Sequence, residues 1–163
     1  MSLTSPHKVL RFLTAVATAT CVASAGELKL ESLLPPPSAF TGACSPAPAK
    51  DGYSNPHVSS DATFLATAAE LGGSPFPVAQ LREVALAYYG SPMMAGLALY
   101  RFENGGAAET AARKLKAQSD LKSEAYRTEV FRKGTVVAMA WEHRGTEPSC
   151  LPPILRHYES VLR

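Results

Sequence analysis

Apolar residues occupy both faces of a predicted strand over residues 96–102. Side chains alternate along a strand, so Leu97 and Leu99 share one face. Tyr100 and Phe102 fall on the other face. Apolar residues on both faces are typical of a strand that lies inside a sheet and is covered on both sides, or on one side and a rim. We therefore expect this strand to be central.

The apolar spacing changes after Asn104, where Gly105 and Gly106 interrupt the strand. Asn104 is a suitable N-cap for a helix that begins at this turn. The next apolar positions recur at i, i+3, i+4 and i+7, which is helical spacing. They are Ala108, Ala111, Ala112 and Leu115. Small alanines let a helix lie close to a neighbouring sheet, so we predict that this helix packs on the strand before it.

Upstream of the central strand, residues 61–71 have helical spacing, with Ser60 or Asp61 as the N-cap. Residues 78–90 fit two interpretations. They match a helix that begins after Pro77, but part of the segment also alternates and is followed by the turn sequence of residues 90–92. We favour a strand, because it gives the central strand a local antiparallel partner.

Two further strands and a helix follow. Residues 126–131 and 135–143 alternate, and Gly134 between them is placed for a left-handed turn. Ser149 is a candidate N-cap for a last helix that ends near residue 163. The pattern is thus a helix followed by two β-β-α units. It predicts an α+β fold: a four-stranded antiparallel sheet with helices on one face.

The N-terminal part of the chain differs in composition. Residues 1–25 have a basic start, an uncharged apolar run and the cleavage sequence Ala23-Ser24-Ala25, which predicts a secretory signal peptide. A lipoprotein alternative would use Cys21, but the residues before it lack the usual Leu and small residue. Residues 26–60 are rich in proline and turn residues and predict an arm that runs over an α+β domain at 61–163.

Cleavage of the signal peptide changes the charge and the cysteine count. The chain has 16 Lys and Arg and 14 Asp and Glu, and Lys8 and Arg11 leave with the signal peptide. A mature chain without net charge gives no electrostatic case for nucleic-acid binding. Cys44 and Cys150 remain, and in an exported chain they predict a disulfide. We expect a periplasmic or extracellular protein without a transmembrane segment after cleavage.

Two stretches carry a family resemblance. The string from Leu97 to Leu115, followed by residues 130–139 with their Lys-Gly-Thr-Val-Val turn, resembles small exported bacterial domains of unknown function. Leu33-Leu34-Pro35 and residues 87–90 are similar to an uncharacterised family of exported bacterial proteins. The order of elements is more distantly similar to PsbP-like α/β-sandwich lipoproteins. The resemblance implies a non-enzymatic accessory or binding role and transfers no catalytic residues.

Residues capable of catalysis or metal binding are few. His57, His143 and His157 lack the spacing of a metal site, and no nucleophile elbow or phosphate-binding loop is present. We therefore expect no cofactor and no metal. The alternative to a binding domain is a small metal-dependent or hydrolytic enzyme with a site near His57 and His143. Cys150 would be a candidate nucleophile only if it were not in a disulfide.

The remaining feature is a group of aromatic residues. Most are expected in the core, but Tyr100, Tyr126 and Trp141 form a candidate ligand surface if a sheet face is open. The sequence therefore predicts an exported, non-enzymatic domain that binds a protein, an envelope component or a small ligand. Binding is expected through the sheet face or the proline-rich arm.

Overall fold

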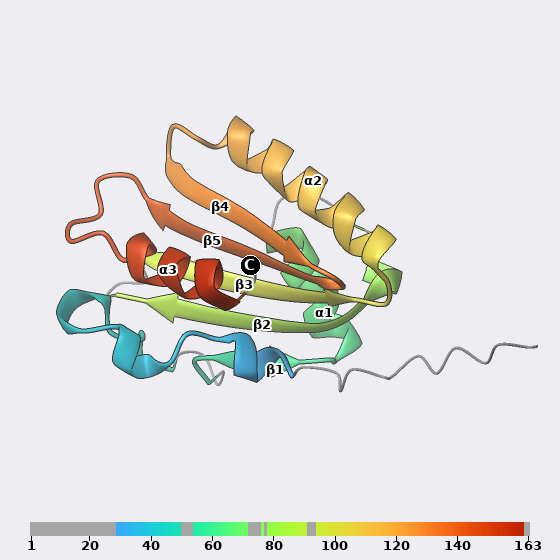
Figure 1. Cartoon of the computed structure of the whole chain (residues 1–163), viewed down its shortest axis with the longest axis horizontal. Helices are drawn as coiled ribbons and strands as arrows, with labels where there is room; N and C mark the ends of the chain where they lie inside the picture. The colour runs from blue at the N-terminus through green and yellow to red at the C-terminus, as the bar shows by residue number, and fades with distance from the viewer. Residues whose placement is uncertain (1–28, 50–53, 72–75, 77, 91–93, 162–163) are drawn as a thin grey trace, which may run out of the picture.

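A five-stranded antiparallel sheet forms the middle of the molecule (Figure 1). The computed structural model describes residues 29–49, 54–71, 76, 78–90 and 94–161. The strands are β1 (His57–Ser59), β2 (Leu81–Tyr89), β3 (Ala95–Phe102), β4 (Tyr126–Lys133) and β5 (Val136–His143). Their spatial order is β1-β2-β3-β5-β4. β3 is therefore central, and every residue in it is buried. The predicted signal peptide at residues 1–25 lies outside the described residues.

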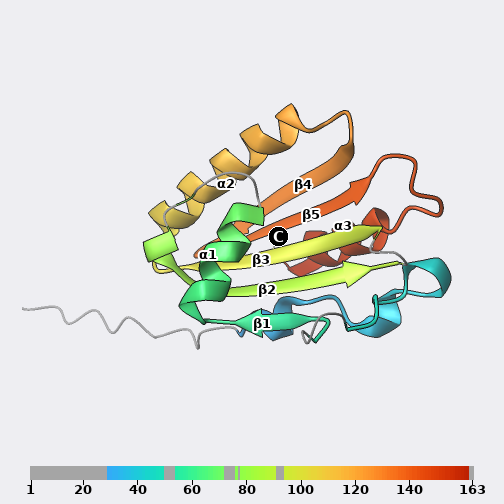
Figure 2. The same ribbon diagram turned by 180° about the vertical axis from the view of Figure 1, so that it is seen from behind.

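The helices are divided between the two faces of the sheet. Figure 2 shows α1 (Ala62–Leu71) and α2 (Gly105–Leu121) on one face, where they enclose a core with residues such as Leu86 and Tyr100. On the other face, α3 (Leu151–Val161) lies in front of the strands in Figure 1. Its core includes Leu97 and Leu99 of β3. The α+β class is confirmed, but the prediction of helices on one face is wrong.

The proline-rich arm covers part of the α3 face. It forms three short 3-10 turns, η1 (Leu30–Leu33), η2 (Pro37–Ala39) and η3 (Gly42–Cys44). Leu30, Leu33 and Phe40 are buried in the core with α3. This explains the incorrect one-face prediction, since a proline-rich segment has no helical periodicity to mark it as a covering layer. The apolar residues on both faces of β3 allowed cover on both sides or on one side and a rim, and the structure has cover on both sides.

The arm also supplies the fifth strand, β1, which the four-strand prediction lacked. Asn55 holds the start of β1 against β2 by mimicking strand pairing. Its side-chain amide donates to the carbonyl oxygens of Ala47 (2.7 Å) and Tyr88 (2.8 Å), and its carbonyl oxygen accepts from the Tyr88 amide (2.9 Å). Val58 of β1 then pairs with Ala85. A strand of three residues is too short to be recognised from an alternation of apolar and polar residues.

The two predicted hairpins are present. β2 pairs with β3, with Leu86 opposite Ala98, so the strand interpretation of this segment is confirmed and the helix alternative is wrong. A 3-10 turn, η4 (Val78–Gln80), precedes β2. The predicted turn includes residues 91–92, which lie outside the described residues. β4 pairs with β5, and Gly134 between them has a φ of 57°.

Candidate ligand-binding site

A pocket of about 280 Å³ lies on the face of the sheet that carries α1 and α2. Strands β2, β3, β4 and β5 form its walls, and the C-terminal end of α2 borders it. In Figure 2, this end of α2 lies beside the β4 end of the sheet, away from α1. The described residues that line the pocket are Leu86, Tyr88, Ala98, Tyr100, Gln118, Ser119, Lys122, Tyr126, Thr128, Met139 and Trp141.

The pairing register of the strands determines where the apolar part of this pocket lies. Leu86 of β2, Ala98 of β3 and Met139 of β5 are successive cross-strand partners and form one row across the sheet. Side chains of directly opposed residues lie on the same face. The row therefore forms an apolar floor.

Trp141 lies directly on the backbone of the neighbouring strand. It pairs with Gly96 of β3, and a Cβ atom at Gly96 would lie 2.1 Å from the Trp141 ring atom Cζ2. Glycine is therefore required there by close approach. The Trp141 ring also meets Tyr88 edge-on, with ring centroids 6.1 Å apart. These contacts give the indole a defined position at the pocket.

The structure brings Tyr100, Tyr126 and Trp141 to the same pocket. Tyr100 is fully buried, so it also belongs to the core, whereas Tyr126 and Trp141 are half-buried. We expected these three residues on a sheet face without helices. The pocket that they line instead lies beside α2, on the face that carries α1 and α2. Whether the three residues form a ligand surface stays a prediction.

Most polar groups that line the pocket have no hydrogen-bond partner among the described residues. Within the described chain, no hydrogen bond involves the side-chain polar atoms of six lining residues, and only the Ser119 hydroxyl bonds, to the Leu115 carbonyl oxygen at 2.8 Å. The six are Tyr88, Tyr100, Gln118, Tyr126, Thr128 and Trp141. Buried tyrosine hydroxyls usually find a partner, as that of Tyr158 does by donating to the Leu33 carbonyl oxygen at 2.8 Å.

Tyr100 lines the pocket although its side chain is fully buried, and no hydrogen bond of its hydroxyl is found within the described chain. Burial raises the pKa of the phenols of Tyr88 and Tyr100 above the usual value. Both hydroxyls therefore stay protonated and are available as donors. Lys122 supplies the one charged side chain among the described lining residues.

The histidines of the enzyme alternative do not converge. His57 is in β1 and His143 is at the end of β5, with β2 and β3 between these strands. Neighbouring strands lie about 4.8 Å apart, so β1 and β5 are about 14 Å apart. The His57 ring packs on Phe64 and the His143 ring on Tyr126, with centroids 4.6 and 4.4 Å apart. Among the described residues, no three His, Cys, Asp or Glu side chains are grouped for a metal ion.

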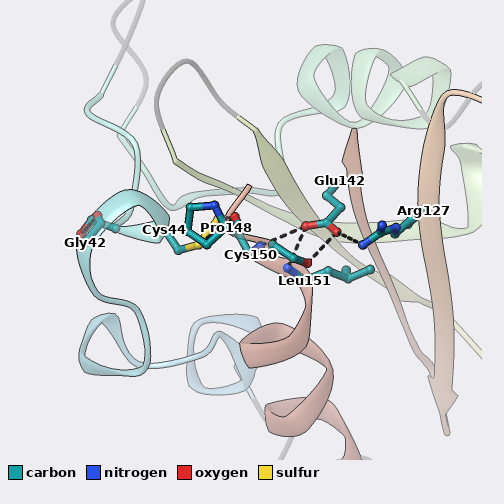
Figure 3. Close-up of a disulfide and its surroundings, with 9 residues drawn as sticks. Gly42, Cys44, Arg127, Glu142, Pro148, Cys150 and Leu151 are labelled. Carbon is teal, nitrogen blue, oxygen red and sulfur yellow. Dashed lines mark hydrogen bonds and ion pairs between the residues drawn. A yellow bond between two sulfur atoms is a disulfide. The ribbon is translucent and has the colours of Figure 1, made fainter. Parts of the chain in front are cut away.

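The predicted disulfide between Cys44 and Cys150 is present, with Cα atoms 5.3 Å apart (Figure 3). It joins the proline-rich arm to the residue before α3. Both cysteines are buried. A disulfide is consistent with an oxidising compartment, and the bonded Cys150 is unavailable as a nucleophile.

Glu142 is a buried charge that the sequence analysis missed. One carboxylate oxygen accepts from the backbone amides of Cys150 (3.0 Å) and Leu151 (3.1 Å) at the start of α3. The other accepts from the Ser149 hydroxyl (2.7 Å) and pairs with Arg127 (3.2 Å), as Figure 3 shows for Arg127. The prediction that Ser149 caps α3 is therefore wrong, because Glu142 supplies the cap. The sequence feature that could have revealed this role is an acidic residue at a position of β5 that faces the core.

A second hollow, of about 440 Å³, lies beside the proline-rich arm. Its described lining comprises Glu31, Leu34, Pro35, Pro36, Pro37, Pro46, Ser54, Asn55, Pro56, Val58, Ala87 and Tyr89. The Asn55 side chain is already bonded to the backbone around β2. This hollow therefore offers mainly proline and aliphatic surface, with fewer unpartnered polar groups than the pocket at α2.

No family model, curated protein or solved structure matches the chain. Within the part of the chain that the structure describes, no helix is both long and apolar enough to cross a membrane.

Proposed function

We propose that the chain is an exported, non-enzymatic domain that binds a small ligand in the pocket at the C-terminal end of α2. The observation that carries this proposal is the combination of an apolar floor with polar side chains that have no partner in the described protein. Ligand sites typically combine apolar walls with a few polar groups that fix orientation. A volume of about 280 Å³ suits a small molecule better than a protein segment.

Export rests on two features. Residues 1–25 have the composition of a signal peptide. The Cys44–Cys150 disulfide requires an oxidising environment to persist. Together they support the periplasm or the extracellular space as the location.

The geometry supports binding more than catalysis. The described lining of the pocket contains no carboxylate, imidazole or thiol, which are common groups for acid–base and nucleophilic steps. The enzyme alternative needs His57 and His143 to act together, and they lie on strands separated by two others.

An unbiased ligand screen tests the proposal. Trp141 is the single tryptophan of the chain, so its fluorescence reports on this pocket alone. We expect some members of a library of small acids, amines, alcohols and sugars to change Trp141 emission and raise the melting temperature. Thr128→Phe, which fills the pocket from β4, should abolish both effects. Ligands that still stabilise this variant, or a library without any binder, would contradict the proposal.

A further inference from the structure

We infer that the pocket selects a small carboxylate with a flat apolar body, held with its charged group towards Lys122. This inference rests on the proposed function, since it names the class of ligand for the same site. It is carried by the charge, the donors and the shape of the pocket.

The charge argument starts from Lys122. Its ammonium group makes no ion pair or side-chain hydrogen bond within the described chain, and no acidic residue is among the described lining residues. The C-terminal end of α2 carries a partial negative charge of about half a unit. The full positive charge of Lys122 is larger, so the mouth of the pocket favours an anion.

The unpartnered polar side chains that line the pocket can all donate a hydrogen bond. The Trp141 indole nitrogen can only donate, and the raised phenol pKa values keep Tyr88 and Tyr100 protonated. A carboxylate needs only donors, whereas a sugar hydroxyl must also donate to an acceptor. The unpartnered side chains can therefore supply the donors that a carboxylate needs.

The remaining walls fit a flat apolar group. Leu86, Ala98 and Met139 form the floor, and the Trp141 ring stands beside it. Aromatic rings and thioether sulfur both pack favourably against an aromatic ligand. The volume of about 280 Å³ is at the small end of ligand sites, which suits a single substituted ring.

A matched pair of probes tests this class. We would titrate 4-chlorobenzoate and 4-chlorobenzamide, which share a flat apolar body and differ in charge, and follow Trp141 emission. The carboxylate should bind about tenfold more tightly than the amide, because a charge-assisted hydrogen bond is worth about that factor. Lys122→Met should reduce the preference to less than about twofold. Lys116→Met, an exposed lysine of α2 outside the pocket, is the control and should leave it unchanged.

Each contrary result has a separate meaning. If both probes bind equally well in the wild type, or Lys122→Met keeps the preference, the charge selection is wrong while the proposed binding function stands. Tighter binding of cellobiose than of the carboxylate would also overturn the inference. If neither probe changes Trp141 emission, the inference fails, and the library screen with Thr128→Phe decides the proposed function separately.

Discussion

Single residues with a steric or electrostatic role fix the position of Trp141 and the start of α3. Gly96 is the clearest case, because its missing Cβ is the space in which the Trp141 ring lies. Glu142 is the corresponding electrostatic case, since its carboxylate holds the start of α3 and pairs with Arg127. Both positions lie on strands next to the sites that they support.

Gly96→Ala should destabilise the protein by about 1–3 kcal/mol, because the indole must move from a well-packed position. Urea unfolding measures this loss, and Trp141 emission should shift at the same time. Gly106→Ala in α2 is the matched control, since the added Cβ would make only an ordinary contact of 3.4 Å. It should be neutral or slightly stabilising. Equal stability of Gly96→Ala and the wild type would mean that Trp141 does not lie on β3.

Glu142→Ala should cost about 2–5 kcal/mol, because it leaves the amides of Cys150 and Leu151 without their acceptor in a buried place. Chemical unfolding measures the change. Glu129→Ala, at an exposed position of β4, is the control and should change stability by less than about 0.5 kcal/mol. A loss for Glu142→Ala no larger than that of the control would contradict its role as the cap of α3.

At the level of elements, local sequence patterns were sufficient to predict helix caps and turns, because the residues that form them are close together in the sequence. The caps of α1 and α2 are as predicted: the Asp61 carboxylate accepts from the amides of Thr63 and Phe64, and the Asn104 side chain accepts from the amide of Ala107. The turn between β4 and β5 is a further local element, with Gly134 in the left-handed region.

Gly134→Val should destabilise the protein by more than about 1 kcal/mol, because a β-branched residue tolerates a φ of 57° poorly. Thermal unfolding gives the measurement. No atom lies within 4 Å of an added Cβ there, so the cost would come from the backbone alone. Gly134→Asn, which tolerates this conformation, should therefore lose less. Identical melting temperatures for the Val variant and the wild type would show that the turn is not left-handed.

The elements that the sequence did not predict depend on long-range contacts. β1 is held by Asn55, whose partners Ala47 and Tyr88 include a residue far along the chain. The covering of the second face by the proline-rich arm follows from burial of Leu30 and Phe40, which no periodicity marks. The pocket residues Tyr100, Tyr126 and Trp141 were predicted as a group, but their place beside α2 required the strand order.

At the scale of the whole molecule, the Cys44–Cys150 disulfide joins the arm to α3 across 106 residues. Closing so long a loop should contribute about 4–5 kcal/mol in the chain-entropy model. Urea unfolding with and without reductant measures this contribution, and the denatured protein without reductant should show no free thiol at either position. Unchanged stability on reduction would contradict the role of the disulfide in fixing the arm.

The proposed export also concerns the whole chain. The Ala23-Ser24-Ala25 sequence predicts that the mature protein begins at Gly26. N-terminal sequencing of protein recovered from outside the cytoplasm tests this start. A lipidated Cys21 as the first residue would contradict it and favour the lipoprotein alternative.

The central claim, that the pocket at the end of α2 binds a small ligand, is tested most directly by NMR. A two-dimensional proton–nitrogen spectrum contains one tryptophan indole signal, because Trp141 is the single tryptophan. During a titration with the strongest binder from the library screen, we predict saturable shifts of this signal and of the backbone amides of Leu86, Tyr100 and Thr128. Shifts confined to the hollow beside the proline-rich arm, around Pro36 and Tyr89, would contradict the account.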